Sequence, residues 1–160
     1  MRMDAPSQHV AVFLEALQDA MQRLRQVHGH YVRRGTAPAR PFLNLSGRPF
    51  SIHEREAIRQ FHGSIVLGLH IKGSDGREYE LAVDVLWDAE RWTITTEAWV
   101  EADAGGQDIL RQLPERTTAD LTGCVAQLAT AVDDLVRFED LVPSRSDPAE
   151  PGVAADGGGT

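Results

Sequence analysis

Apolar residues occupy every second position in three successive stretches of the chain between Gly63 and Val100. The stretches carry Ile65, Leu67, Leu69 and Ile71, then Tyr79, Leu81, Val83, Val85 and Trp87, then Trp92, Ile94, Thr96, Ala98 and Val100. Alternation of this kind is typical of a strand that buries one face. The connections Ser74–Gly76 and Asp88–Arg91 are short and turn-like. The pattern therefore predicts an antiparallel meander, with a weaker fourth strand near residues 107–113 that ends at Pro114.

Two other segments show the helical period instead. In residues 8–33 and again in residues 118–139, apolar side chains return every three or four positions. The first stripe consists of Val10, Leu14, Leu17, Met21, Leu24, His28 and Tyr31, and the second of Leu121, Val125, Leu128, Val132 and Leu135. Such spacing places the residues of each stripe on one side of an α-helix. Each helix is therefore predicted to pack one face against the sheet.

These elements predict a single α+β domain over residues 1–142. A long N-terminal helix and a C-terminal helix are expected to cover one face of an antiparallel meander of three to four strands. Residues 34–62, with three prolines before Phe50, are predicted to be irregular and linker-like, apart from a short helix that Ser51 and Glu54 could cap. Residues 143–160 are predicted to be a disordered tail, because they contain few side chains that could form a core.

The hairpin registers follow from keeping one face of the meander apolar, since a slip of one residue would exchange the two faces. Pairing Ile71 with Tyr79 satisfies this condition and leaves a three-residue loop that ends in glycine, which suits a left-handed backbone. Pairing Trp87 with Trp92 makes a cross-strand aromatic pair on the apolar face. Trp99 has the opposite parity, so the third tryptophan is predicted to lie on the other face.

The same registers gather charged side chains on the face opposite the helices. Besides Trp99, this second face is predicted to carry His70, Glu78, Glu80, Asp84, Glu97 and Glu101. Antiparallel sheets often leave one face in solvent, and a tryptophan on such a surface can concentrate binding energy. We therefore expect a partner-binding surface formed by Trp99, Glu80, Asp84, Glu97 and His70. The competing interpretation is that residues 34–62 fold over this face, bury Trp99 and pair their arginines with the carboxylates.

The charge distribution indicates what kind of partner such a surface would bind. The formal net charge is −8, which argues against nucleic acid or an anionic membrane as the partner. Residues 1–62 have a net charge of +4, and residues 63–160 have a net charge of −12. The acidic part contains the predicted second face, so the expected partner is another protein with a basic surface.

The N-terminal helix also raises the question of self-association. Its apolar stripe runs through three heptads, which is close to the minimum for a coiled-coil dimer. The other interpretation is that the sheet and the second helix use the whole stripe within one chain. We favour the monomer over the homodimer.

The sequence contains no motif that fixes a chemistry. It has no glycine-rich phosphate loop, no GxSxG and no CxxC. His53 and His62 are nine positions apart, which on a helix would place them on opposite faces. The single cysteine, Cys124, is predicted to be a buried apolar side chain rather than a nucleophile. We accordingly expect no catalytic residue, no metal and no cofactor.

The sequence thus favours a non-enzymatic, cytoplasmic protein-interaction module that uses an acidic sheet face. We expect a cytoplasmic location because the chain has no apolar segment typical of a signal peptide or a membrane span, and no second cysteine for a disulfide. The layout resembles secretion chaperones and toxin-neutralising immunity proteins at the level of fold alone, without a shared motif. The alternative is a small-molecule binding or catalytic domain with a pocket between the sheet and residues 34–62.

Overall fold

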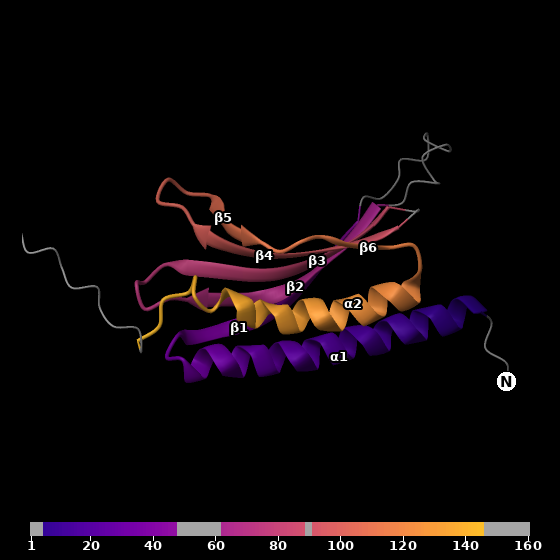
Figure 1. Ribbon diagram of the computed structural model, residues 1–160, viewed down its shortest axis with the longest axis horizontal. Helices are drawn as coiled ribbons and strands as arrows, with labels where there is room; N and C mark the ends of the chain where they lie inside the picture. Colours follow the sequence, from indigo (N-terminus) through magenta and orange to yellow (C-terminus); the bar gives the residue numbers. More distant parts are fainter. Residues whose placement is uncertain (1–4, 48–61, 89–90, 146–160) are drawn as a thin grey trace, which may run out of the picture.

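The computed structural model describes residues 5–47, 62–88 and 91–145, which form an α+β fold (Figure 1). The helix α1 (Ala5–Arg33) comes first, and the helix α2 (Leu121–Asp133) and the 3-10 helix η2 (Asp134–Phe138) come last. Between them lie the strands β1 (Ala37–Gly47), β2 (His62–Lys72), β3 (Glu78–Asp88), β4 (Trp92–Glu101), β5 (Gln107–Gln112) and β6 (Arg116–Thr118). The first five strands form an antiparallel sheet in chain order, and β6 pairs with β4 on the same side as β5. The predicted fold class is confirmed, with more strands than expected.

The strand β1 corrects part of the prediction for residues 34–62. We expected an irregular segment, but Ala37–Gly47 pairs with β2 at the edge of the sheet. Pro38 and Pro41 lie in this strand, and proline is tolerated in an edge strand because one side has no ladder partner to satisfy. The prolines also interrupt the apolar alternation by which the other strands are recognised. The short helix expected after Phe50 falls outside the described residues, and His62 already belongs to β2.

The folded part of the chain continues slightly beyond Val142, after which we expected the tail to begin. The backbone N–H of Ser74 donates a hydrogen bond of 3.0 Å to the carbonyl of Pro143. Ser144 is buried. Residues 146–160, which make up the rest of the predicted tail, lie outside the described residues.

Both hairpin registers agree with the prediction. β2 and β3 pair Ile71 with Tyr79, and β3 and β4 pair Trp87 with Trp92. The ring centroids of Trp87 and Trp92 are 5.9 Å apart, and the ring of Phe13 in α1 lies 5.6 Å from that of Trp92. Two of the three tryptophans therefore join α1 to the sheet as part of an aromatic cluster.

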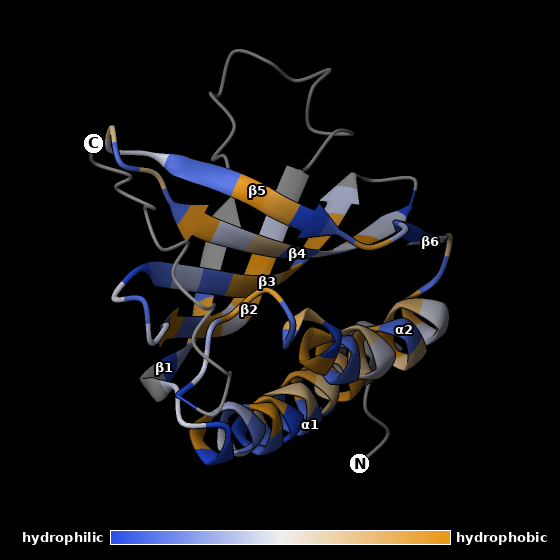
Figure 2. Ribbon diagram, turned by 60° about the vertical axis from the view of Figure 1, so that its left-hand side comes forward, coloured by the Kyte–Doolittle hydropathy of each residue, from blue (hydrophilic) through white to orange (hydrophobic). Residues whose placement is uncertain are grey.

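Both helices pack on the same face of the sheet (Figure 2). The strand residues beneath them that are exposed by 1% or less include Leu67, Leu69, Leu81, Val83, Val85 and Ile94. The helical layer contributes Leu24, Val27, Tyr31, Leu128, Val132, Leu135 and Phe138 to the same core. This facing is the one that the matching apolar patterns predict. It leaves the alternate residues of each strand on the opposite side of the sheet.

The apolar stripe of α1 differs from the predicted one at its N-terminal end. Leu24 and Tyr31 are buried as expected, whereas Leu14 is 54% exposed. Phe13 takes the inward position instead and contacts Trp92. The reason is geometric, because Phe13 lies five full turns of 3.6 residues before Tyr31. Leu14 lies one residue short of five full turns from Tyr31, so it points about 100° away from Tyr31 around the helix.

Tyr31→Phe is expected to destabilise the fold by about 1 kcal/mol. The phenol of Tyr31 is buried and donates a hydrogen bond of 2.8 Å to the carbonyl of Leu135, which ties α1 to η2. The variant leaves that carbonyl without its donor, and denaturant unfolding would measure the loss. Tyr79→Phe is the matched control, because the Tyr79 hydroxyl donates to the exposed Asp75 at 2.7 Å, where water can replace it. Equal losses in the two variants would contradict this account.

Candidate functional site

The face of the sheet turned away from the helices carries the residues that we predicted to bind a partner. Glu80 of β3 lies opposite His70 of β2 on one side and opposite Trp99 of β4 on the other. The next pair of β3 and β4 that faces the same way is Ala82 with Glu97, and the one after it is Asp84 with Thr95. Directly opposite residues share a face of the sheet, so all five side chains belong to one surface. We call the surface formed by these five residues the acidic face.

Trp99 is half-buried in the acidic face. Its indole N–H donates a hydrogen bond of 3.0 Å to Oε2 of Glu97, which holds the ring beside one carboxylate. The cross-strand neighbour of Trp99 on β5 is Ile109, which is 51% exposed. Trp99 and Ile109 therefore form an apolar patch between the charged side chains and the edge of the sheet.

Ile109 was not predicted to belong to this surface, although a strand near residues 107–113 was. The reason is a bulge in the pairing of β4 with β5, where Trp99 lies opposite Ile109 but Ala98 lies opposite Arg111. A bulge inserts one residue into a strand, so apolar alternation alone cannot give the register. The two glycines that end the β4–β5 loop are the signal that could have placed Ile109 beside Trp99, because counting residues outward from this loop along both strands pairs them.

His70 lies beside Glu80 and is held by two neighbours. Its ring stacks on Phe42 of β1, with centroids 4.4 Å apart and an angle of 26° between the ring planes. Its Nδ1 lies 3.6 Å from Oε2 of Glu80, and the same oxygen accepts a hydrogen bond of 3.4 Å from Nε2 of Gln107. Phe42 is the second residue of this surface that was not predicted, because β1 itself was not predicted.

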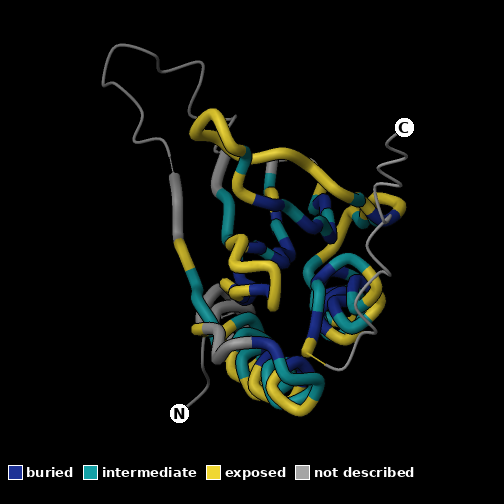
Figure 3. The backbone as a smooth tube through the Cα atoms, turned by 90° about the vertical axis from the view of Figure 1, so that its left-hand side faces the viewer, coloured by how far each residue is buried: buried dark blue, intermediate teal, exposed yellow. Residues whose placement is uncertain are grey.

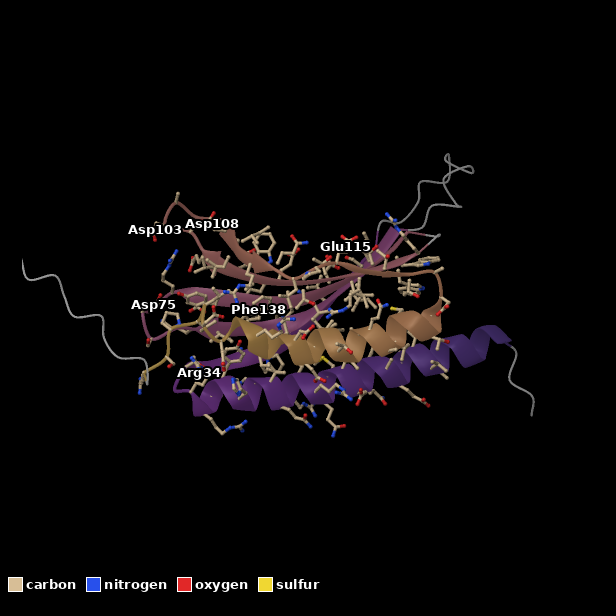
Figure 4. All side chains as sticks on the ribbon, in the orientation of Figure 1. Arg34, Asp75, Asp103, Asp108, Glu115 and Phe138 are labelled. Carbon is tan, nitrogen blue, oxygen red and sulfur yellow. The ribbon has the colours of Figure 1, made fainter. Side chains whose placement is uncertain are left out.

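A hollow of about 320 Å³ opens beside these residues. It is lined by His70, Glu78, Tyr79, Glu80, Glu101, Gly106 and Gln107. The acidic loop residues Asp75 and Asp103 lie toward this same end of the molecule (Figure 4). The lining is rich in carboxylates and comes from strands β2 to β5, so it suits a cationic side chain better than an apolar ligand. The alternative function places its pocket between the sheet and residues 34–62, of which residues 48–61 lie outside the described residues.

Asp84 occupies an unfavourable position for a charged group. Its Oδ1 is shielded from solvent and has no hydrogen-bond partner within the described part of the chain. Burial, and to a lesser extent the charge of Glu97, raise the pKa of Asp84 above its ordinary value. The ionised carboxylate therefore lowers the stability of the fold. A group that lowers stability at a surface is typical of a residue kept for function.

Asp84→Asn is expected to raise the melting temperature at pH 7 and to leave it nearly unchanged at pH 3. Because the fold raises the pKa of Asp84, its penalty is absent below the ordinary pKa of about 3.9 and grows as the pH rises through the folded pKa. Thermal denaturation at both pH values measures the difference. The matched control, Asp103→Asn in the exposed β4–β5 loop, should give no such gain. A lower melting temperature for Asp84→Asn at pH 7 would contradict the direction of the pKa.

Five arginines of the described residues form ion pairs with carboxylates of the helices or of the segment just after η2, and none of these pairs involves the acidic face. The pairs are Arg23 with Asp19 and Asp133, Arg34 with Glu139, Arg111 with Asp140, and Arg116 and Arg137 with Asp134. Within residues 5–47, 62–88 and 91–145, no arginine or lysine forms an ion pair with Glu80, Asp84 or Glu97. Arg40 of β1 is exposed, and the other arginines after it in residues 34–62 lie outside the described residues. That these arginines cover the acidic face therefore stays a prediction.

The remaining chemistry of the described residues is limited. No group of three or more histidine, cysteine, aspartate or glutamate side chains among them is placed to hold a metal ion. Cys124 is buried, and burial raises the pKa of its thiol to about 11, which keeps it protonated near neutral pH. None of the helices in the described ranges is both long and apolar enough to cross a membrane.

Comparison with known proteins gives no relative from which a function could be transferred. No protein-family model, no curated protein and no solved structure matches the chain. The interpretation of the acidic face therefore depends on its own geometry and charge.

Proposed function

We propose that this protein is a non-enzymatic, cytoplasmic interaction module whose acidic face binds a basic surface of another protein. The proposal rests on one observation. A partly exposed apolar patch, formed by Trp99 and Ile109, lies beside carboxylates that have no arginine or lysine partner in the described residues. The indole supplies contact area that excludes water, and the carboxylates select and steer a cationic partner. The raised pKa of Asp84 supports the proposal, because a basic partner would restore the favourable surroundings that this carboxylate lacks.

The proposal is tested by titrating the isotope-labelled protein with two panels of short peptides. One panel is rich in lysine and arginine and the other in aspartate and glutamate, with the same apolar residues in both. Two-dimensional NMR separates the indole N–H signal of Trp99 from those of Trp87 and Trp92. The basic panel is expected to shift the Trp99 signal at low salt, and the effect should weaken as salt screens the charges. If no basic peptide shifts the Trp99 signal, or if the acidic panel binds better, the proposal is wrong.

A pair of double variants separates the acidic face from net charge as the cause of binding. Glu80→Gln with Glu97→Gln removes two carboxylates from the acidic face. Glu15→Gln with Asp19→Asn removes two exposed carboxylates from α1, in the helical layer, and changes the net charge equally. The first variant is expected to lose most of the peptide affinity and the second to keep it. Equal losses would show that the net charge, rather than this face, attracts the peptide.

A further inference from the structure

β5 is a terminal strand of the sheet, and no strand of the described residues pairs with its outer side. Most of its length is exposed (Figure 3). Ile109 is 51% exposed and Leu110 is 40% exposed. Sheet edges are usually protected by charges, prolines or a covering segment, because open backbone groups attract a further strand. An exposed edge with apolar side chains is therefore a template for the addition of a strand from another protein.

One hydrogen bond at the start of β5 shows which of its backbone groups point outward. In the β4–β5 loop, the N–H of Ala102 donates to the carbonyl of Gly106 at 3.1 Å. Bonded and non-bonded pairs alternate along an antiparallel ladder. Counting along the register from this bonded pair, Trp99 and Ile109 form a non-bonded pair. The N–H and C=O of Ile109 therefore point away from β4, toward the open edge.

The bulge limits how much of the edge is available. Pairing is regular from Gln107 to Ile109, and Leu110 is then the extra residue before Arg111 returns to the ladder. Bulges end regular pairing and bend the strand that contains them. The edge therefore offers a short docking site centred on Ile109, rather than a long ladder.

We propose that an extended segment of the basic partner adds as a strand to the outer side of β5 and places an apolar side chain next to Ile109. This inference rests on the proposed function, because the row of Trp99 and Ile109 joins the edge to the acidic face. An added strand would lie about 4.8 Å from β5 and about 10 Å from β4. Side chains two positions before and after its apolar residue would share the same face and come within reach of Glu97 and Glu101.

Charge complementarity then predicts a five-residue pattern for the docking segment. Its first and last residues are basic, its middle residue is apolar, and any residue can occupy the two positions between them. The alternation is required because only every second side chain of a strand lies on the face of Trp99. A second copy of this chain is a poorer occupant, since pairing two β5 edges would bring two acidic faces together. The partner segment is therefore an extended basic peptide rather than the chain itself.

The experiment uses a peptide with lysine, valine and lysine at alternate positions and serine or threonine between them. A second peptide of the same composition, with the lysines and the valine adjacent, is the matched control. The patterned peptide is expected to slow amide hydrogen exchange at Ile109 about tenfold or more, and the control peptide to bind more weakly. If the peptide shifts the Trp99 indole but leaves exchange at Ile109 unchanged, strand addition is wrong while the proposed function stands. If no basic peptide shifts Trp99, the proposed function fails and this inference fails with it.

Two substitutions test the backbone directly. Ile109→Pro removes an outward N–H without breaking a bond to β4, and Ile109→Ala removes the side chain but keeps the N–H. The proline variant is expected to bind the patterned peptide about fivefold more weakly than the alanine variant, as befits one lost hydrogen bond. Equal affinities would overturn strand addition. Sedimentation of the peptide-free protein measures whether a second copy of the chain occupies the β5 edge. A dimer with slow amide exchange at Ile109 would assign the edge to that second copy instead.

Discussion

Trp99→Ala is expected to weaken the binding of a basic peptide about 30-fold, which corresponds to about 2 kcal/mol. The side chain is half-buried between Glu80 and Ile109, and its one hydrogen bond goes to Glu97 of the same surface. Truncation therefore removes the apolar centre of the acidic face and leaves the core under the helices intact. Calorimetric titration measures the affinity, and thermal denaturation measures the stability, which should fall only slightly.

Trp92→Ala is the matched control for this variant, because it truncates the same side chain on the other face of the same strand. Trp92 packs against Trp87 and Phe13, so its loss is expected to lower the stability and to leave peptide binding unchanged. The competing interpretation makes Trp99 part of a covered core, for which truncation costs about 3–5 kcal/mol. A strongly destabilised Trp99→Ala variant, with Trp99 fluorescence shielded from a quencher in the wild type, would show that this face is not a binding surface.

The inner strands could be predicted from the sequence because each of them buries one face. Apolar alternation then predicts both that a strand is present and which residues it pairs with, since a shift of one residue would expose the core. The pairs Ile71–Tyr79 and Trp87–Trp92 follow from this rule, and so does the place of Trp99 on the opposite face. The acidic face was predictable for the same reason, because assigning the apolar residues to one face leaves the alternate residues of each strand for the other.

The edges of the sheet could not be predicted in the same way. β1 contains Pro38 and Pro41, which an edge strand tolerates but which remove the signal of alternation. β5 contains a bulge, so its register, and with it the pairing of Ile109 with Trp99, does not follow from periodicity. The two residues missed at the site, Phe42 and Ile109, come from these two edge strands.

Val83→Ala is expected to destabilise the fold by about 2 kcal/mol. Val83 lies in the middle of β3, paired with Leu67 and Thr96, and is fully buried beneath the helical layer. Its truncation would leave a cavity that the strands on both sides cannot close. Leu86→Ala is the matched control, because it removes more carbon atoms from the same strand on the opposite face, where Leu86 is 39% exposed. Denaturant unfolding of both variants measures the free energies. Burial decides the outcome, so the smaller truncation should give the larger loss, and a larger loss for Leu86→Ala would mean that the assignment of the two faces is wrong.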